Sequence, residues 1–255
     1  MIPVGDFIRR RTTPYVNWTL IAINIAVFVY TLTLDTRPDA LIGRFQTSEV
    51  DRFMLDWGFV SSCLTEQLGF SSGASPRELA AICPEGNREL IQPFTATFVH
   101  AGWAHIAGNM LFLWIFGDNV EDNVGHVRYL AFYLLAGLGA AAVQTAFTTD
   151  ATVPAVGASG AIAGVLAGYL IMFPTAVVQV VIIPLFFIPF FVPAALLIGI
   201  WFLTQLFAGI GEVGRATTGA GIAWWAHVGG FITGAVLILF FRQRRRPGWQ
   251  SLDRR

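Results

Sequence analysis

The sequence predicts an all-α integral membrane protein with six transmembrane helices. Hydrophobic residues make up 55% of the 255-residue chain and charged residues only 13%, and the apolar residues form long blocks. A soluble domain of this length needs more charge to cover its surface. The 16 basic and 16 acidic residues balance, so the charge indicates no nucleic-acid partner. The expected surroundings are a lipid bilayer.

Each expected helix is a stretch of about 20 mostly apolar residues, the length that crosses the hydrocarbon core of a bilayer. The six stretches are residues 16–34, 102–118, 129–147, 156–173, 190–209 and 222–241. Proline interrupts helical hydrogen bonding, so Pro184, Pro189 and Pro193 leave the start of the fifth helix open. Residues 174–189 could form a re-entrant or interfacial connection.

Arginines flank the first and last helices and predict the orientation. Cytoplasmic ends of membrane segments carry an excess of arginine and lysine, and arginines cluster at 9–11 and 242–246. We therefore expect a cytoplasmic N-terminus (1–15), a membrane domain (16–241) with a long outer loop (35–101), and a basic cytoplasmic tail (242–255). The expected location is a bacterial cell membrane, with the first helix as a retained signal anchor.

The outer loop holds the only two cysteines, Cys63 and Cys83. A position outside the cytoplasm permits a disulfide. Two unpaired thiols are the alternative.

A candidate site is expected from polar side chains inside three of the helices: His105 and Asn109 in the second, Ser159 in the fourth and His227 in the sixth. Such residues are costly in lipid and indicate function. Helices two, four and six all begin at the outer face, and at 1.5 Å per residue the four side chains lie within roughly 5–10 Å of it. They are therefore expected to form one site. His126, by contrast, is expected to be solvated in a cytoplasmic turn.

The chemistry of these residues indicates a serine nucleophile. A serine hydroxyl needs a base to take its proton, and histidine is the usual base. No acidic residue lies at the same depth, so we expect a Ser159–His227 dyad rather than a triad. His105, Asn109 and the Ser159 backbone N–H are available to stabilise an oxyanion. Glycines spaced four apart would let the fourth and sixth helices pack closely; these are Gly160, Gly164, Gly168, Gly230 and Gly234.

Three motifs resemble the rhomboid family of intramembrane serine proteases. Gly157–Gly160 matches its GxSG motif, Ala226–Gly230 its AHxxG motif, and His105–Asn109 its HxxxN stretch, preceded by a further histidine, His100. The resemblance covers residues 90–240 and implies a rhomboid-like bundle. It implies that Ser159 is the nucleophile and His227 the general base, while His105 and Asn109 support the oxyanion.

The resemblance also implies the substrate: transmembrane or juxtamembrane segments of other membrane proteins, cut after small residues where the helix is weak. It implies no cofactor and no metal. The chain departs from the family at two places. Ile91 and Gln92 replace a Trp-Arg pair that anchors the first loop, and Ala163 replaces an aromatic residue that packs on the base.

Other functions remain as alternatives. Gly69–Gly73 fits the GxSxG hydrolase motif, but that motif needs a strand-to-helix turn in an α/β sheet. A transporter would carry repeats and interrupted helices meeting at the bilayer midplane. A non-catalytic relative that binds membrane clients would lack Ser159 or His227, and both are present.

Overall fold

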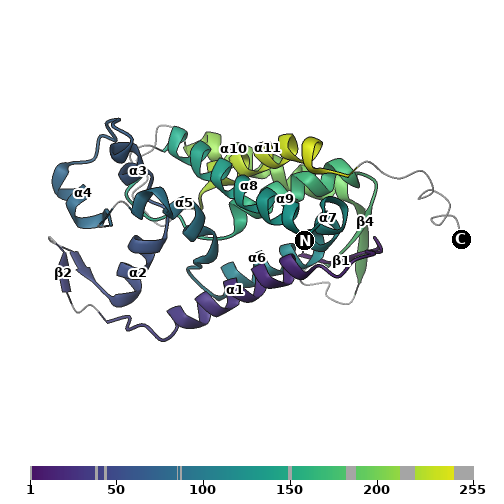
Figure 1. The fold of residues 1–255 in the computed structure, drawn as a ribbon, viewed down its shortest axis with the longest axis horizontal. Helices are drawn as coiled ribbons and strands as arrows, with labels where there is room; N and C mark the ends of the chain where they lie inside the picture. The colour runs from purple at the N-terminus through teal and green to yellow at the C-terminus, as the bar shows by residue number, and fades with distance from the viewer. Residues whose placement is uncertain are drawn as a thin grey trace, which may run out of the picture.

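The structure, a computed structural model, is mostly helical. It describes residues 2–37, 40–42, 45–84, 86, 88–148, 151–181, 188–212 and 222–243. Long helices form an elongated bundle, with short helices gathered at one end and a small sheet at the other (Figure 1). The basic tail expected at 242–255 lies almost wholly outside the described residues.

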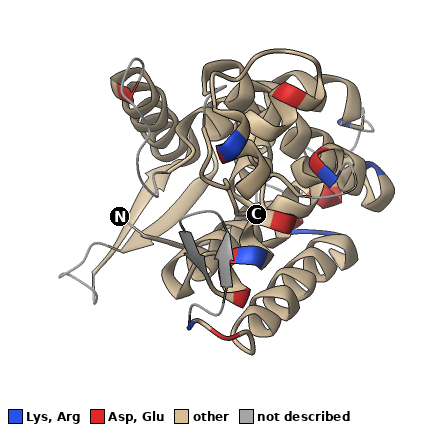
Figure 2. Ribbon diagram, turned by 90° about the vertical axis from the view of Figure 1, so that its left-hand side faces the viewer, with Lys and Arg blue, Asp and Glu red and all other residues tan. Residues whose placement is uncertain are grey.

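The long helices follow the expected apolar stretches within a few residues. Their bounds are α1 Tyr15–Thr31, α8 His126–Phe147, α9 Ser159–Met172, α10 Ala194–Glu212 and α11 Trp224–Phe241. Among the described helices, α8, α10 and α11 are long and apolar enough to cross a membrane, while α1 and α9 are apolar but shorter. The ribbons of the long helices carry few charged residues (Figure 2). The chain is therefore a membrane protein by composition and helix length. Three helices of its described part are candidate spans, where six spans were expected.

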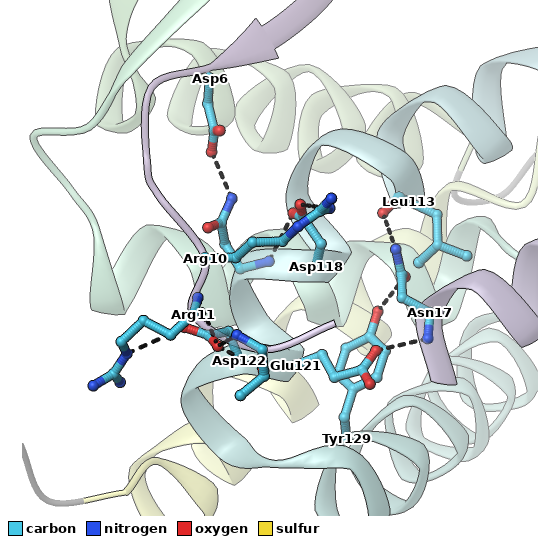
Figure 3. Close-up of polar contacts among 11 residues, drawn as sticks. Asp6, Arg10, Arg11, Asn17, Leu113, Asp118, Glu121, Asp122 and Tyr129 are labelled. Carbon is cyan, nitrogen blue, oxygen red and sulfur yellow. Dashed lines mark hydrogen bonds and ion pairs between the residues drawn. The ribbon is translucent and has the colours of Figure 1, made fainter. Parts of the chain in front are cut away.

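The second expected helix is divided into α6 (Trp103–Phe112), a π-helical turn η3 (Leu113–Gly117) and α7 (Asp118–Val124). Asn17 of α1 reaches this turn: its Nδ2 donates to the Leu113 carbonyl at 2.9 Å, and its Oδ1 accepts from the Tyr129 hydroxyl at 2.8 Å (Figure 3). A side chain at Gly117 would overlap the Asn17 amide. A polar side chain inserted into the helical ladder is a recognised cause of such irregular turns.

Helix α9 lies at the centre of the bundle, and its residues from Gly160 to Tyr169 are buried. The glycines bring its backbone against that of α11. A methyl group at Gly230 would overlap the Gly160 carbonyl oxygen and lie 2.8 Å from its carbonyl carbon. One at Gly234 would lie 2.7 Å from the Gly164 carbonyl carbon. The two helices are thus in backbone contact, which is how small residues stabilise helix pairs in lipid.

A three-stranded antiparallel sheet corrects the expectation of an all-α protein. Strand β4 (Val177–Val181) lies between β1 (Ile2–Asp6) and β5 (Pro189–Pro193). The sheet occupies most of the described part of the connection expected at 174–189. Proline is tolerated at the ends of an edge strand, where its missing N–H breaks no ladder bond; β5 is such a strand.

Polar contacts fasten the N-terminus to the bundle. Asp6 accepts hydrogen bonds from the Tyr169 hydroxyl at 2.5 Å and from Asn119 Nδ2 at 2.9 Å. Arg10 pairs with Asp118 at 3.1 Å (Figure 3). Burial raises the pKa of Asp6, and the hydrogen bond from Tyr169 partly offsets this rise.

The segment 35–101 is folded rather than an irregular loop. It contains α2 (Glu49–Trp57), α3 (Ser61–Gln67), α4 (Pro76–Ile82), α5 (Gln92–Thr95), the 3₁₀ turns η1 (Arg88–Leu90) and η2 (Ala96–Phe98), and the paired strands β2 (Ala40–Ile42) and β3 (Phe45–Thr47). Ser48 and Ser75 form capping boxes that start α2 and α4. Cys63 and Cys83 form a disulfide.

Gln92 occupies the position where the family has its Trp-Arg pair. Its side chain is fully buried, and its Nε2 donates to the Leu55 carbonyl at 2.7 Å. Gln92 therefore ties α5 to α2 and anchors this segment by a different contact.

Candidate active site

Ser159 and His227 lie at the same end of two helices that pack side by side. Ser159 is the first residue of α9, and His227 is the fourth residue of α11. The Ser159 Oγ is 2.8 Å from the His227 Nε2, although the residues are 68 positions apart. The helices must run parallel to bring both N-terminal turns together. The structure therefore joins the two residues that the sequence predicted as partners.

The turn before Ser159 depends on Gly157. Its φ of +123° lies in the region that side chains rarely adopt. Its Cα also faces two polar side chains, because a methyl group there would lie 2.5 Å from His105 Nε2 and 3.5 Å from Asn109 Nδ2. Glycine is required both by the backbone and by the space. His105 and Asn109 thus converge beside the start of α9.

Asn109 has a free donor at this place. The residue is 8% exposed, and its Nδ2 has no hydrogen-bond partner within the described part of the chain. The first backbone N–H groups of an α-helix also have no partner within the helix, and Ser159 provides one of them at the start of α9. The positive end of the helix dipole favours negative charge at this point. The arrangement can therefore hold an anionic oxygen.

His100 lies behind these groups. Its Nε2 accepts a hydrogen bond from the Ala158 N–H at 3.5 Å, and its ring packs edge-on against His105 at 5.1 Å. Burial and the neighbouring His105 lower the pKa of His100 to about 4. A neutral His100 supports the loop before Ser159 without adding charge.

Gln205 is a site residue that the sequence motifs did not reveal. It lies on α10 and is 6% exposed, and its Oε1 is 2.8 Å from His227 Nδ1. Its Nε2 donates to the Trp201 carbonyl at 3.2 Å and to the Thr204 hydroxyl at 3.0 Å. An amide side chain in the middle of a mostly apolar helix was the available signal.

Aromatic rings from α10 and α11 pack against the His227 ring in place of one at Ala163. The Trp201 ring centre lies 5.8 Å from that of His227, and Trp224 meets the same ring edge-on at 6.3 Å. Ala163 itself is fully buried. The packing on the imidazole thus comes from other residues than the family pattern implies.

Two other polar residues that the sequence singled out lie outside the site. Ser71, the serine of the Gly69–Gly73 motif, is exposed in the segment between α3 and α4, which joins two helices and not a strand and a helix. His126 begins α8 and contacts the buried Glu121, so the expectation that it is simply solvated is wrong. Neither belongs to the group around Ser159.

The chain is similar to known proteins. A family model described as a rhomboid domain matches residues 87–244, which include every residue of the site. RHOMBOID-like protein 2 of Arabidopsis thaliana is 27% identical over 94% of this chain and 71% of its own length. Rhomboid-like protein 11, chloroplastic, of the same plant is 44% identical over 29% of this chain and 26% of its own length. The human presenilin-associated rhomboid-like protein, mitochondrial, is 33% identical over 36% of this chain and 24% of its own length.

These relatives come from a plant and a mammal, so they give no support to the expected bacterial cell membrane. The match to the family does not depend on the membrane in which the protein lies. It covers more than half of the chain and contains the paired Ser159 and His227. The chain belongs to the rhomboid family.

Proposed function

We propose that the protein is an intramembrane serine endopeptidase that cleaves transmembrane or juxtamembrane segments of other membrane proteins. The observation that carries this proposal is the 2.8 Å contact between the Ser159 hydroxyl and His227 Nε2. A serine activated by an imidazole, beside partner-free donors, is the arrangement that acyl transfer needs.

The mechanism follows from this geometry. His227 Nε2 takes the hydroxyl proton as Ser159 Oγ forms a bond to the substrate carbonyl carbon. The resulting oxyanion accepts hydrogen bonds from Asn109, His105 and the Ser159 backbone N–H. The C–N bond then breaks, and His227 returns the proton to the leaving amine. Water attacks the acyl-serine by the same route, releases the carboxyl product and restores Ser159.

The membrane arrangement forms part of the proposal. The helices that carry the site would cross the bilayer as part of a six-span bundle. Helix α9 can be shorter than its neighbours because they surround it and shield it from lipid. Both termini would lie in the cytoplasm, and the site would lie near the outer surface, where water can reach the acyl-serine. Residues 1–15, 16–241 and 242–255 would then be the N-terminus, the membrane domain and the tail.

Cleavage of a single-span model substrate in proteoliposomes tests the function. Ser159→Ala and His227→Ala should each lower the cleavage rate by at least about 10³-fold. A fluorophosphonate should label the wild-type protein on Ser159 and should not label either variant. Ser62→Ala is the matched control, because Ser62 is a fully buried serine of α3 outside the site. It should cleave at the wild-type rate.

Wild-type cleavage by the Ser159→Ala protein would refute the proposal. A wild-type protein that captures the substrate but neither cleaves it nor reacts with the fluorophosphonate would instead support a client-binding relative without catalysis.

A further inference from the structure

The amide of Gln205 has a defined orientation. Its NH₂ group donates to the Trp201 carbonyl and to the Thr204 hydroxyl. Both contacts place the nitrogen on the α10 side, so the oxygen must face His227. Because a carbonyl oxygen only accepts hydrogen bonds, the 2.8 Å contact requires a proton on His227 Nδ1.

This proton determines the tautomer of the imidazole. A neutral histidine that carries its proton on Nδ1 has an unprotonated Nε2. That Nε2 lies 2.8 Å from the Ser159 hydroxyl, where it can accept the serine proton. The opposite tautomer would point an N–H at the nucleophile and could not act as a base.

We propose that Gln205 is a positioning residue that holds His227 in the tautomer and orientation needed to activate Ser159. This inference rests on the proposed function and adds a third, uncharged member from α10 to the expected dyad. An amide suits this place because an isolated carboxylate is far more costly than an amide in an apolar environment. Trp201 and Trp224 confine the ring from two directions while Gln205 sets its rotation.

Gln205→Met tests the role because methionine keeps the length of the side chain and removes the acceptor. We expect kcat for the model substrate to fall by about 10- to 100-fold with KM unchanged, since the base is affected and substrate binding is not. Gln205→Glu restores an acceptor and adds negative charge. An adjacent carboxylate favours the imidazolium form, so the acid limb of the pH–rate profile should move to higher pH.

Gln144→Met is the matched control. Gln144 is 8% exposed, and its Oε1 accepts from the Ala226 N–H at 2.9 Å, one residue before the base, without contacting the ring. A purely structural role would make the two methionine variants alike. We expect Gln144→Met to lose stability to a similar degree while kcat and the acid limb stay at wild-type values.

The ¹⁵N chemical shifts of the His227 ring report which nitrogen carries the proton, and this measurement does not depend on cleavage. The wild-type protein should show the proton on Nδ1, and Gln205→Met should show a mixture of tautomers. Wild-type spectra with the proton on Nε2 would overturn the proposal whether or not the protein cleaves. If the wild type cleaves and Gln205→Met matches it in kcat, only the role of Gln205 fails. If the wild type is inactive, the proposed function fails.

Discussion

The contact between α9 and α11 gives the sharpest prediction, because Gly230→Ala places one methyl group between two backbones. The new Cβ would overlap the Gly160 carbonyl oxygen and lie 2.8 Å from its carbonyl carbon. Carbon atoms at optimal contact are about 3.5–4.0 Å apart. Backbone atoms cannot rotate away, so the helices must separate by about 1 Å to restore that distance.

This separation acts directly on the site. Gly160 follows Ser159, and Gly230 lies three residues after His227, so the 2.8 Å contact between Oγ and Nε2 opens by a similar amount. A separation of about 3.8 Å is no longer a hydrogen bond, because its donor and acceptor normally lie within about 3.2 Å. A misplacement of about 1 Å can lower an enzymatic rate by about 100-fold. Overpacking of this kind also lowers the free energy of unfolding by about 1–3 kcal/mol or more.

The assay is cleavage of the model substrate in proteoliposomes, together with thermal unfolding of the purified protein. Gly199→Ala of α10 is the matched control, since nothing described lies within 4 Å of a methyl group at that position. It should leave both cleavage and unfolding near wild-type values. Wild-type cleavage and stability in Gly230→Ala would refute the backbone contact between α9 and α11.

Two further predictions concern parts of the fold away from the site. Replacing Cys63 and Cys83 together by alanine removes a disulfide across 20 residues, which should lower the free energy of unfolding by about 3 kcal/mol. A reductant should lower the stability of the wild type by the same amount and leave that of the variant unchanged. A variant as stable as the oxidised wild type would contradict this prediction. The raised pKa of Asp6 means that its contribution to stability is full below its unfolded pKa and is lost as pH rises through its folded pKa. Asp6→Asn should therefore raise the melting temperature relative to wild type at about pH 7 and much less at about pH 4, and an equal difference at both pH values would show that burial does not set this pKa.

The positions of the helices were predictable because each apolar stretch is local in the sequence. The helices that carry Ser159 and His227 were predictable too, because the glycines beside these residues lie in the same apolar stretches. The π-helical turn η3 was not predictable from its own residues. It depends on Asn17, which reaches Leu113 from 96 positions away. Gly117 permits this approach, but glycine is common in membrane helices for close packing alone.

Gln205 escaped prediction for a related reason. Glutamine is uncharged, so it stands out less in an apolar stretch than an acidic or basic residue would. Its role depends on whether its side of α10 faces His227. Strand β1 was not predictable because its partner, β4, follows about 175 residues later. Pro189 and Pro193 are obstacles to a helix, as expected, yet they are also compatible with an edge strand. Local pattern cannot choose between these structures when the deciding partner is distant.

The pairing of β1 with β4 determines the order in which the protein can be assembled. Asp6 and Tyr169 are separated by 163 residues, so the N-terminal strand is synthesised long before its binding surface exists. At a synthesis rate of about 5–20 residues per second, this interval is roughly 8–33 s. The residues of β1 must remain unpaired through that time, until β4 has been synthesised. A bulky fusion placed before Ile2 should therefore slow the formation of this sheet rather than the insertion of the helices.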